Sequence, residues 1–148
     1  MTRFAPVYRA LGMIIMLFGL TLLVPLALSY VVDDGAQTVY DETFLLTVLC
    51  GTFLWYRYRN CKRDLGIRDG FLLVALVWTV LPAFSALPFM LQLGMTHTDA
   101  YFEAVSGLTA TGATVISGLD SLPPSINLWR HQLMWVGGMG LIVLAVAI

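Results

Sequence analysis

The chain has 148 residues, of which 59% are hydrophobic and only 11% are charged, and its mean hydropathy is +0.83. An average soluble domain carries about a quarter charged residues, so this composition excludes a soluble globular protein and indicates an integral membrane protein. Cys50 and Cys61 belong to no C-x-x-C or Cys/His cluster, which argues against a metal site or a disulfide framework. The sequence has no Walker motif and no nucleophile paired with a base, so we expect neither an enzyme nor an organic cofactor.

Stretches without Asp, Glu, Lys or Arg predict the membrane-spanning helices. The first stretch, 10–32, has 23 residues, and about 20 apolar residues span a bilayer as a helix. Pro25 lies inside it, and membrane helices tolerate proline. The second stretch, 43–56, has only 14 residues. Aromatic and arginine side chains at 55–59 are typical of a membrane interface, so we assign a second span there.

Two further stretches follow. Residues 70–98 form a run of 29 that contains Pro82 and Pro88, and they predict a third span followed by an outer loop. Residues 131–148 form a run of 18 and predict a fourth span. Because the sequence stops inside this run, we expect it to be an N-terminal fragment of a longer protein.

The distribution of charge predicts the orientation in the membrane. Seven of the eight basic residues flank the first span or lie between the second and third: Arg3, Arg9, Arg57, Arg59, Lys62, Arg63 and Arg68. Seven of the nine acids fall on the opposite side: Asp33, Asp34, Asp41, Glu42, Asp99, Glu103 and Asp120. Basic loops stay in the cytoplasm, so we expect a cytoplasmic N-terminus. The basic loop between the second and third spans is interpreted as the cytoplasmic loop that sets this topology, and contact with anionic membrane lipid or a cytoplasmic partner is the alternative. No nucleic-acid partner is expected.

The segment SGLTATGATVISGLD, residues 106–120, is small, hydroxyl-rich and nearly uncharged, and it begins and ends on the outer side. The residues before it, 96–108, predict a short helix that is capped by Thr96 or Thr98 and has Asp99 in its first turn. The segment is either a surface loop or a re-entrant pore loop. The apolar side chains of the short helix favour re-entry, and Gly107 and Gly112 offer places for that helix to end.

The chemistry of this segment fits a cation filter. Backbone carbonyls that face one axis replace the water around K⁺, and glycine allows the backbone angles that this needs. Residues 109–114 meet these demands, and Ala110, Thr111 and Gly112 within them are taken as the candidate K⁺-binding residues. The C-terminal end of the short helix favours a cation. Asp99 and Glu103 would raise the local cation concentration if they face the outer vestibule.

The fourth predicted span adds two candidate features. Arg130 is interpreted either as an interfacial residue that snorkels to the surface or as a partner of Asp120 or Glu103 that supports the filter loop. The glycines of WVGGMG, at 137, 138 and 140, indicate close helix packing. The alternative is that they make the inner helix flexible enough to gate a pore.

Residues 106–120 and the following LWRHQLMWVGGMGLIVLAVAI at 128–148 resemble the first pore repeat of TrkH-type membrane subunits of bacterial potassium-uptake systems, within the Trk/Ktr/HKT superfamily. The filter segment, the D-S-L-P-P loop, the W-R pair and the G-G-M-G motif carry the resemblance, which is clearest over 97–148. It implies an all-α membrane protein with a leading helix pair at 1–66. The first repeat of two spans, a re-entrant pore helix and a filter loop would occupy 67–148, truncated at the end of its second helix.

The resemblance also implies a function. The chain would supply one of four filter segments of a pore that takes up K⁺ across the bacterial inner membrane, with carbonyls of Thr111 and Gly112 lining the K⁺ sites. Partners would be three further repeats, a second subunit in a homodimer and a TrkA-type cytoplasmic nucleotide-binding regulator. Coupling to H⁺ or Na⁺ and channel-like flux both stay open. The alternatives are a small structural or assembly membrane protein and a non-functional remnant.

Overall fold

The computed structural model describes residues 4–61 and 63–147, with the backbone alone at 141 and 143–147. Arg3 and Lys62, which contributed to the predicted orientation, and Ile148 lie outside the described residues. The elements in chain order are α1 (Ala5–Thr21), α2 (Leu23–Val32), α3 (Gln37–Tyr58), α4 (Ile67–Ser85), α5 (Leu87–Leu93), α6 (His97–Leu108), η1 (Leu119–Ser121) and α7 (Pro124–Ala147). The described residues contain no strand, in agreement with the predicted all-α class.

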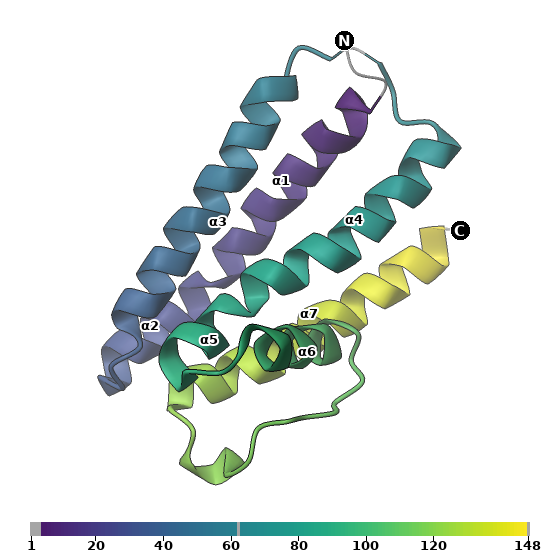
Figure 1. The fold of residues 1–148 in the computed structure, drawn as a ribbon. Helices are drawn as coiled ribbons and strands as arrows, with labels where there is room; N and C mark the ends of the chain where they lie inside the picture. The colour runs from purple at the N-terminus through teal and green to yellow at the C-terminus, as the bar shows by residue number, and fades with distance from the viewer. Residues whose placement is uncertain (1–3, 62, 148) are drawn as a thin grey trace.

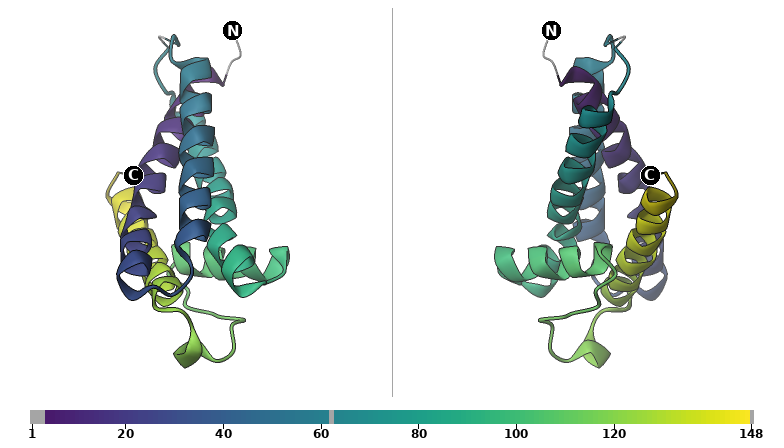
Figure 2. Two further views of the ribbon diagram at one scale, coloured as in Figure 1. Left: turned by 90° about the vertical axis from the view of Figure 1, so that its left-hand side faces the viewer. Right: turned by 90° about the vertical axis from the view of Figure 1, so that its right-hand side faces the viewer.

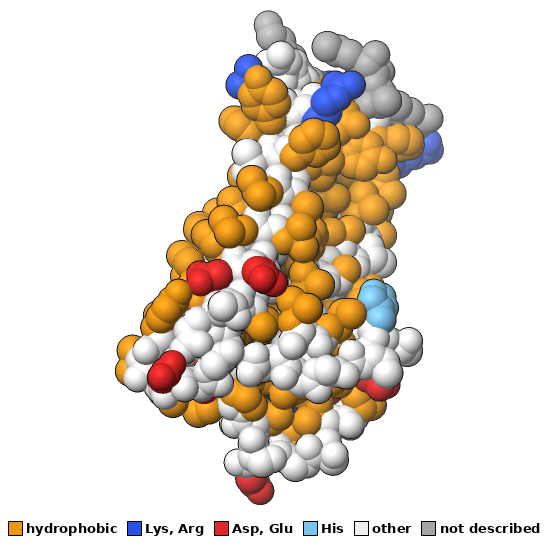
Figure 3. Space-filling model, turned by 60° about the vertical axis from the view of Figure 1, so that its left-hand side comes forward, with side chains coloured by type: hydrophobic (Ala, Val, Ile, Leu, Met, Phe, Trp, Pro, Cys, Tyr) orange, Lys and Arg blue, Asp and Glu red, His pale blue; other side chains and the backbone are white. Residues whose placement is uncertain are grey.

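Helices α1, α3 and α4 run along one another, and α7 packs against α2 and α6 (Figure 1). The N-terminus and the α3–α4 connection lie at one end of the bundle, called here the basic end. The α2–α3 connection, α5, α6 and residues 109–123 lie at the other, the loop end, where α6 runs crosswise to the long helices (Figure 2). Lys and Arg side chains gather at the basic end, and acidic side chains lie toward the loop end (Figure 3).

The first predicted span is a helix divided at Leu22. Proline has no backbone N–H, so Pro25 cannot donate to the carbonyl of Thr21, and the helix is interrupted there. Together α1 and α2 form one 28-residue segment, Ala5–Val32, that is apolar and long enough to cross a membrane. It begins five residues before the predicted 10–32 and therefore includes Arg9, whose side chain donates to the carbonyl of Cys61.

The other spans also differ from their predicted bounds. Segment Ile67–Leu93 is the second segment of the described chain that is long and apolar enough to cross a membrane, and it is divided at Ala86 because Pro88 has no N–H for the preceding turn. Helix α3 has 22 residues rather than the predicted 14. Charged residues bounded that prediction, yet Asp41 and Glu42 lie inside α3, because an acid at a helix surface does not end the helix.

Small residues let α1 and α3 approach closely. A Cβ added to Gly12 would lie 2.7 Å from the backbone nitrogen of Trp55, and one added to Gly51 would lie 2.9 Å from that of Met16. Where the two helices cross, their backbones are therefore in direct contact, as is common between membrane helices.

A buried aromatic cluster joins the leading helices to α7. The Trp129 ring lies 6.0 Å from that of Phe18 and 6.5 Å from that of Tyr40, and its indole N–H donates to the carbonyl of Ser85. Trp129 and Tyr40 are fully buried. The core thus links α1, α3 and α4 to the helix that follows the candidate filter segment.

Candidate functional site

The site begins at the N-terminus of α6. The hydroxyl of Thr96 accepts a hydrogen bond from the backbone N–H of Asp99 at 3.2 Å and donates to its carboxylate at 2.8 Å. Of the two predicted caps, Thr96 is therefore the one that the structure uses, and Thr98 lies inside the helix. Asp99 is half-buried and borders a hollow that is also lined by Leu93, Met95, Val115, Ile116, Ser117 and Leu122.

Helix α6 ends at Leu108 in a Schellman arrangement. The N–H of Ala110 donates to the carbonyl of Gly107, and the N–H of Thr111 donates to that of Ser106, both at 2.9 Å. The residue in left-handed conformation is Ala110, with φ of +54°, where glycine is usual. The prediction that Gly107 or Gly112 ends the helix is therefore wrong. Gly107 instead lies inside α6, where an added Cβ would be 3.0 Å from Leu133.

The candidate ion-binding residues begin in this turn, at Ala110, and continue at Thr111 and Gly112 into an exposed segment that is neither helix nor strand. Gly112 has φ of +76°, a left-handed conformation that glycine adopts without strain. Among the described residues, the carbonyls of Ala110, Thr111 and Gly112 accept no hydrogen bond. These three oxygens are therefore available to coordinate a cation next to the C-terminal end of α6, which carries partial negative charge.

Helix α6 holds the same segment through side chains on one of its faces. The hydroxyl of Ser106 donates to the carbonyl of Ala113 at 2.6 Å. The carboxylate of Glu103 accepts from the hydroxyl of Thr114 at 2.9 Å and from the backbone N–H of Val115 at 3.2 Å. The sequence analysis did not single out Ser106. Residues 103 and 106 are one helical turn apart, and this spacing could have predicted that Ser106 lies on the same face of α6 as Glu103.

Glu103 also forms a buried ion pair with Arg130 of α7. The Nε of Arg130 lies 2.7 Å from the carboxylate of Glu103. The Arg130 side chain is 6% exposed and the Glu103 side chain is 2% exposed. Two interpretations are thereby corrected. Arg130 does not snorkel to the interface, and its partner is Glu103 rather than Asp120. Glu103 does not face a vestibule, because its oxygens are occupied by Arg130, Thr114 and Val115.

The glycines of α7 divide into two kinds. A Cβ added to Gly137 would lie 1.9 Å from the carbonyl oxygen of Leu108, so α7 touches the backbone at the end of α6. A Cβ at Gly138 or Gly140 would meet nothing within 4 Å. Close packing is therefore confirmed at Gly137 and not at the other two.

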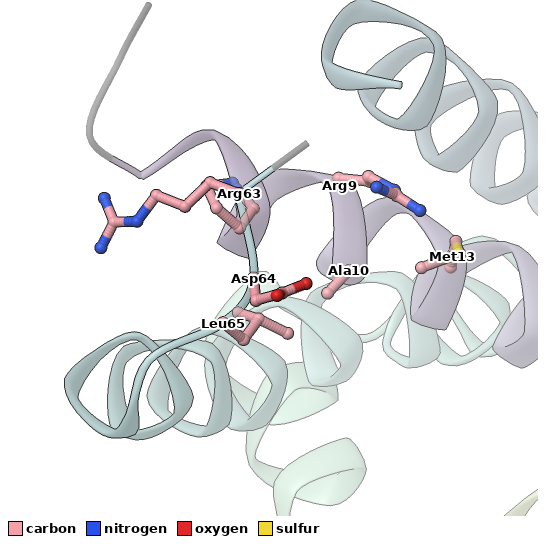
Figure 4. A pocket seen from close by; sticks show the side chains of 7 residues that line it. Arg9, Ala10, Met13, Arg63, Asp64 and Leu65 are labelled. Atoms are coloured by element: carbon pink, nitrogen blue, oxygen red, sulfur yellow. The ribbon is translucent and has the colours of Figure 1, made fainter. Parts of the chain in front are cut away.

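A second hollow lies at the basic end, far from the filter segment. It is lined by the start of α1 and the loop before α4: Pro6, Arg9, Ala10, Met13, Arg63, Asp64 and Leu65 (Figure 4). The guanidinium of Arg63 lies 3.1 Å from the carboxylate of Asp69. The lining thus includes two arginines and one aspartate. The described residues contain no group of three or more His, Cys, Asp or Glu side chains that fits a metal ion.

The family model of TrkH, described as a cation transport protein, matches residues 36–148. The chain belongs to the TrkH family. The Trk system potassium uptake protein TrkH of Escherichia coli K12 is 46% identical over 148 residues, which are 99% of this chain and 31% of that protein. The Trk system potassium uptake protein TrkG of the same organism is 37% identical over 139 residues, 93% of this chain and 29% of that protein.

The family has a solved structure that matches the whole fold. The crystal structure of the potassium transporter TrkH from Vibrio parahaemolyticus superposes with a TM-score of 0.92 at 44% identity, over 99% of this chain and 32% of that chain. The predicted family and fold class are therefore confirmed. The chain spans about 31% of the length of the E. coli relative.

Proposed function

We propose that this chain supplies one of four filter segments of a pore-forming subunit that takes up K⁺. The observation that carries the proposal is a run of successive backbone carbonyls that includes those of Ala110, Thr111 and Gly112 and has no hydrogen-bond donor among the described residues. Coordination of a dehydrated cation needs such oxygens in a fixed arrangement. The named function of the relatives, potassium uptake, agrees with that chemistry.

In this proposal the buried pair Glu103–Arg130 supports the filter rather than touching the ion. Glu103 fixes the segment after the carbonyl run, and the hydrogen bonds from the N–H groups of Ala110 and Thr111 to the last turn of α6 fix its start. Asp99 stabilises the start of the pore helix and borders the hollow that is lined by residues 115–117 of the chain after the carbonyl run. Each repeat would contribute its own carbonyls, so a complete pore needs three further segments of this kind.

We further propose the bacterial inner membrane as the location, with the basic end in the cytoplasm and the filter segment outside. The described arginines at the basic end and the acids toward the loop end support this orientation. Partners in the proposal are the three remaining repeats, a second subunit in a homodimer and a TrkA-type nucleotide-binding regulator at the basic end. The division into a leading pair at 1–66 and a first repeat at 67–148 belongs to the same proposal.

The test is Gly112→Ser in the protein expressed from its complete natural reading frame, called below the complete protein. A serine at φ of +76° strains the filter segment, and we expect K⁺ uptake to fall or to lose selectivity against Na⁺ while membrane insertion stays normal. The matched control is Gly94→Ser, which also has positive φ, +64°, but lies between α5 and α6. Unchanged uptake and selectivity in Gly112→Ser, or lost assembly alone, contradicts the proposal and favours a packing role.

A further inference from the structure

Helix α7 begins without a cap of its own. Its first residue is Pro124, and the preceding Pro123 has no side-chain acceptor, so the N–H of Ser125 lacks a local partner. The partner comes from the α2–α3 connection, 91 residues away, where the carboxylate of Asp34 accepts from Ser125 at 2.9 Å. Asp34 therefore caps α7 from the leading helices, and its negative charge lies at the positive end of the helix dipole.

The same connection is itself fixed. The other carboxylate oxygen of Asp34 accepts from the hydroxyl of Ser29 and from the N–H of Ala36. The fully buried Tyr40 donates through its hydroxyl to the carbonyl of Ser125 at 3.0 Å. Both backbone groups of Ser125 are thus bound by the leading helices.

A second hydrogen-bonded connection, or tie, between the leading helices and α7 lies two turns further along α7. The carbonyl of Thr21 has no helical donor because Pro25 lacks an N–H. The side-chain amide of Gln132 donates to this carbonyl at 2.7 Å. The carbonyl left without a helical donor at the break in the first span is therefore bound by a side chain of α7, the helix that follows the filter segment.

Helix α7 also packs against α6, through Arg130, Leu133 and Gly137 among others. Arg130 is bound to Glu103, and Gly137 contacts the backbone of Leu108. We propose, resting on the proposed filter function, that the leading helix pair positions the first filter segment through α7, with Asp34 and Gln132 as positioning residues. Neither residue touches the candidate carbonyls, so their effect passes through α7.

The experiment uses Asp34→Ala and Gln132→Met in the complete protein, with Asp33→Asn as the matched control. Asp33 is adjacent and carries the same charge, but its carboxylate accepts from Gln37 and, among the described residues, from no group of α7. Uptake is measured at equal membrane abundance as a function of K⁺ concentration, with Na⁺ as competitor. We expect a rise of about fivefold in the K⁺ concentration for half-maximal uptake, comparable with the loss of one helix cap, and no change in the control.

A double variant separates positioning from folding. Pro25→Ala gives the carbonyl of Thr21 its own N–H donor, so adding it to Gln132→Met removes the cost of a buried unsatisfied carbonyl without restoring the tie to α7. We expect membrane abundance to recover while the half-saturating K⁺ concentration stays raised.

Unchanged half-saturating K⁺ concentration and Na⁺ competition in both Asp34→Ala and Gln132→Met, at equal abundance, overturns the inference if Gly112→Ser does impair selectivity. If Gly112→Ser also leaves uptake and selectivity unchanged, the proposed function itself fails, so the two failures are distinguishable.

Discussion

Replacing Glu103 by glutamine removes one partner of the buried ion pair while keeping the shape of the side chain. The carboxylate accepts from Arg130, Thr114 and Val115, and glutamine offers one acceptor oxygen in place of two. The guanidinium of Arg130, with a side chain only 6% exposed, then stays buried without a counter-charge.

Breaking a buried ion pair by removing one partner typically costs about 3–5 kcal/mol, because the remaining charge is desolvated and uncompensated. The double variant Glu103→Gln, Arg130→Met leaves no lone charge, so it should be more stable than Glu103→Gln alone by about 2 kcal/mol or more. Asp99→Asn is the control on the same helix. It keeps an acceptor at a half-buried cap, so we expect it to cost about 1 kcal/mol or less.

The assay is equilibrium unfolding of the purified complete protein in detergent, followed by uptake measurements on the variants that stay folded. The Thr114 and Val115 contacts are also weakened in Glu103→Gln, so we expect K⁺ selectivity to fall together with the free energy of unfolding. A cost below about 1 kcal/mol, or strictly additive effects in the double variant, would refute the argument that the pair is buried and coupled.

Three further predictions concern packing, strain and pH. Gly137→Ala places a Cβ 1.9 Å from the carbonyl of Leu108 and should destabilise the protein by about 1–3 kcal/mol, whereas Gly138→Ala meets nothing within 4 Å and should be neutral or stabilising. Ala110→Gly removes the strain of φ +54° and should leave the free energy of unfolding unchanged or raise it by up to about 1 kcal/mol. Burial raises the pKa of the Asp34 carboxyl, but the hydrogen bonds from Ser29, Ser125 and Ala36 together lower that pKa by more than burial raises it. The pKa of Asp34 in the folded protein is therefore below its usual value. Its stabilisation is therefore present above about pH 4 and is lost as the pH falls through the folded-state pKa, a dependence that Asp34→Ala should weaken in unfolding measurements between pH 7 and pH 3.

For each of these three predictions there is a result that would contradict it. Equal losses in Gly137→Ala and Gly138→Ala would contradict the close approach of α7 to α6. A clear destabilisation by Ala110→Gly would show that the methyl group of Ala110 stabilises the turn by more than the strain of its left-handed conformation destabilises it. An unchanged acid profile in Asp34→Ala would show that Asp34 is not held by these hydrogen bonds in the folded protein.

Local features of the site could be predicted because they depend on neighbours in the sequence. Thr96 was one of the two predicted caps, and it is the one that stands three residues before an acid; the chain after α6 is irregular and exposed, in keeping with its Gly/Thr composition. The exact turn was missed because Ala110, rather than a glycine, takes the left-handed conformation, at a cost that the contacts around it offset.

Long-range features could not be predicted from one sequence. Glu103 and Arg130 are 27 residues apart, and Asp34 and Ser125 are 91 apart, so each pairing exists only because α7 docks against both α6 and the leading helices. Arg130 near a predicted membrane boundary fits snorkelling equally well until that docking is known. The bounds of the spans were wrong for a different reason, since charge marked their ends although Arg9 and Asp41 lie within helices.

The most direct measurement is to locate bound cations in the complete protein by anomalous diffraction from crystals containing Tl⁺ or Rb⁺ as substitutes for K⁺. The proposed function predicts an ion coordinated by the carbonyl oxygens of Thr111 and Gly112, together with oxygens from the other repeats. Ions bound elsewhere along the transport path, with these carbonyls hydrogen-bonded to protein groups, would contradict it.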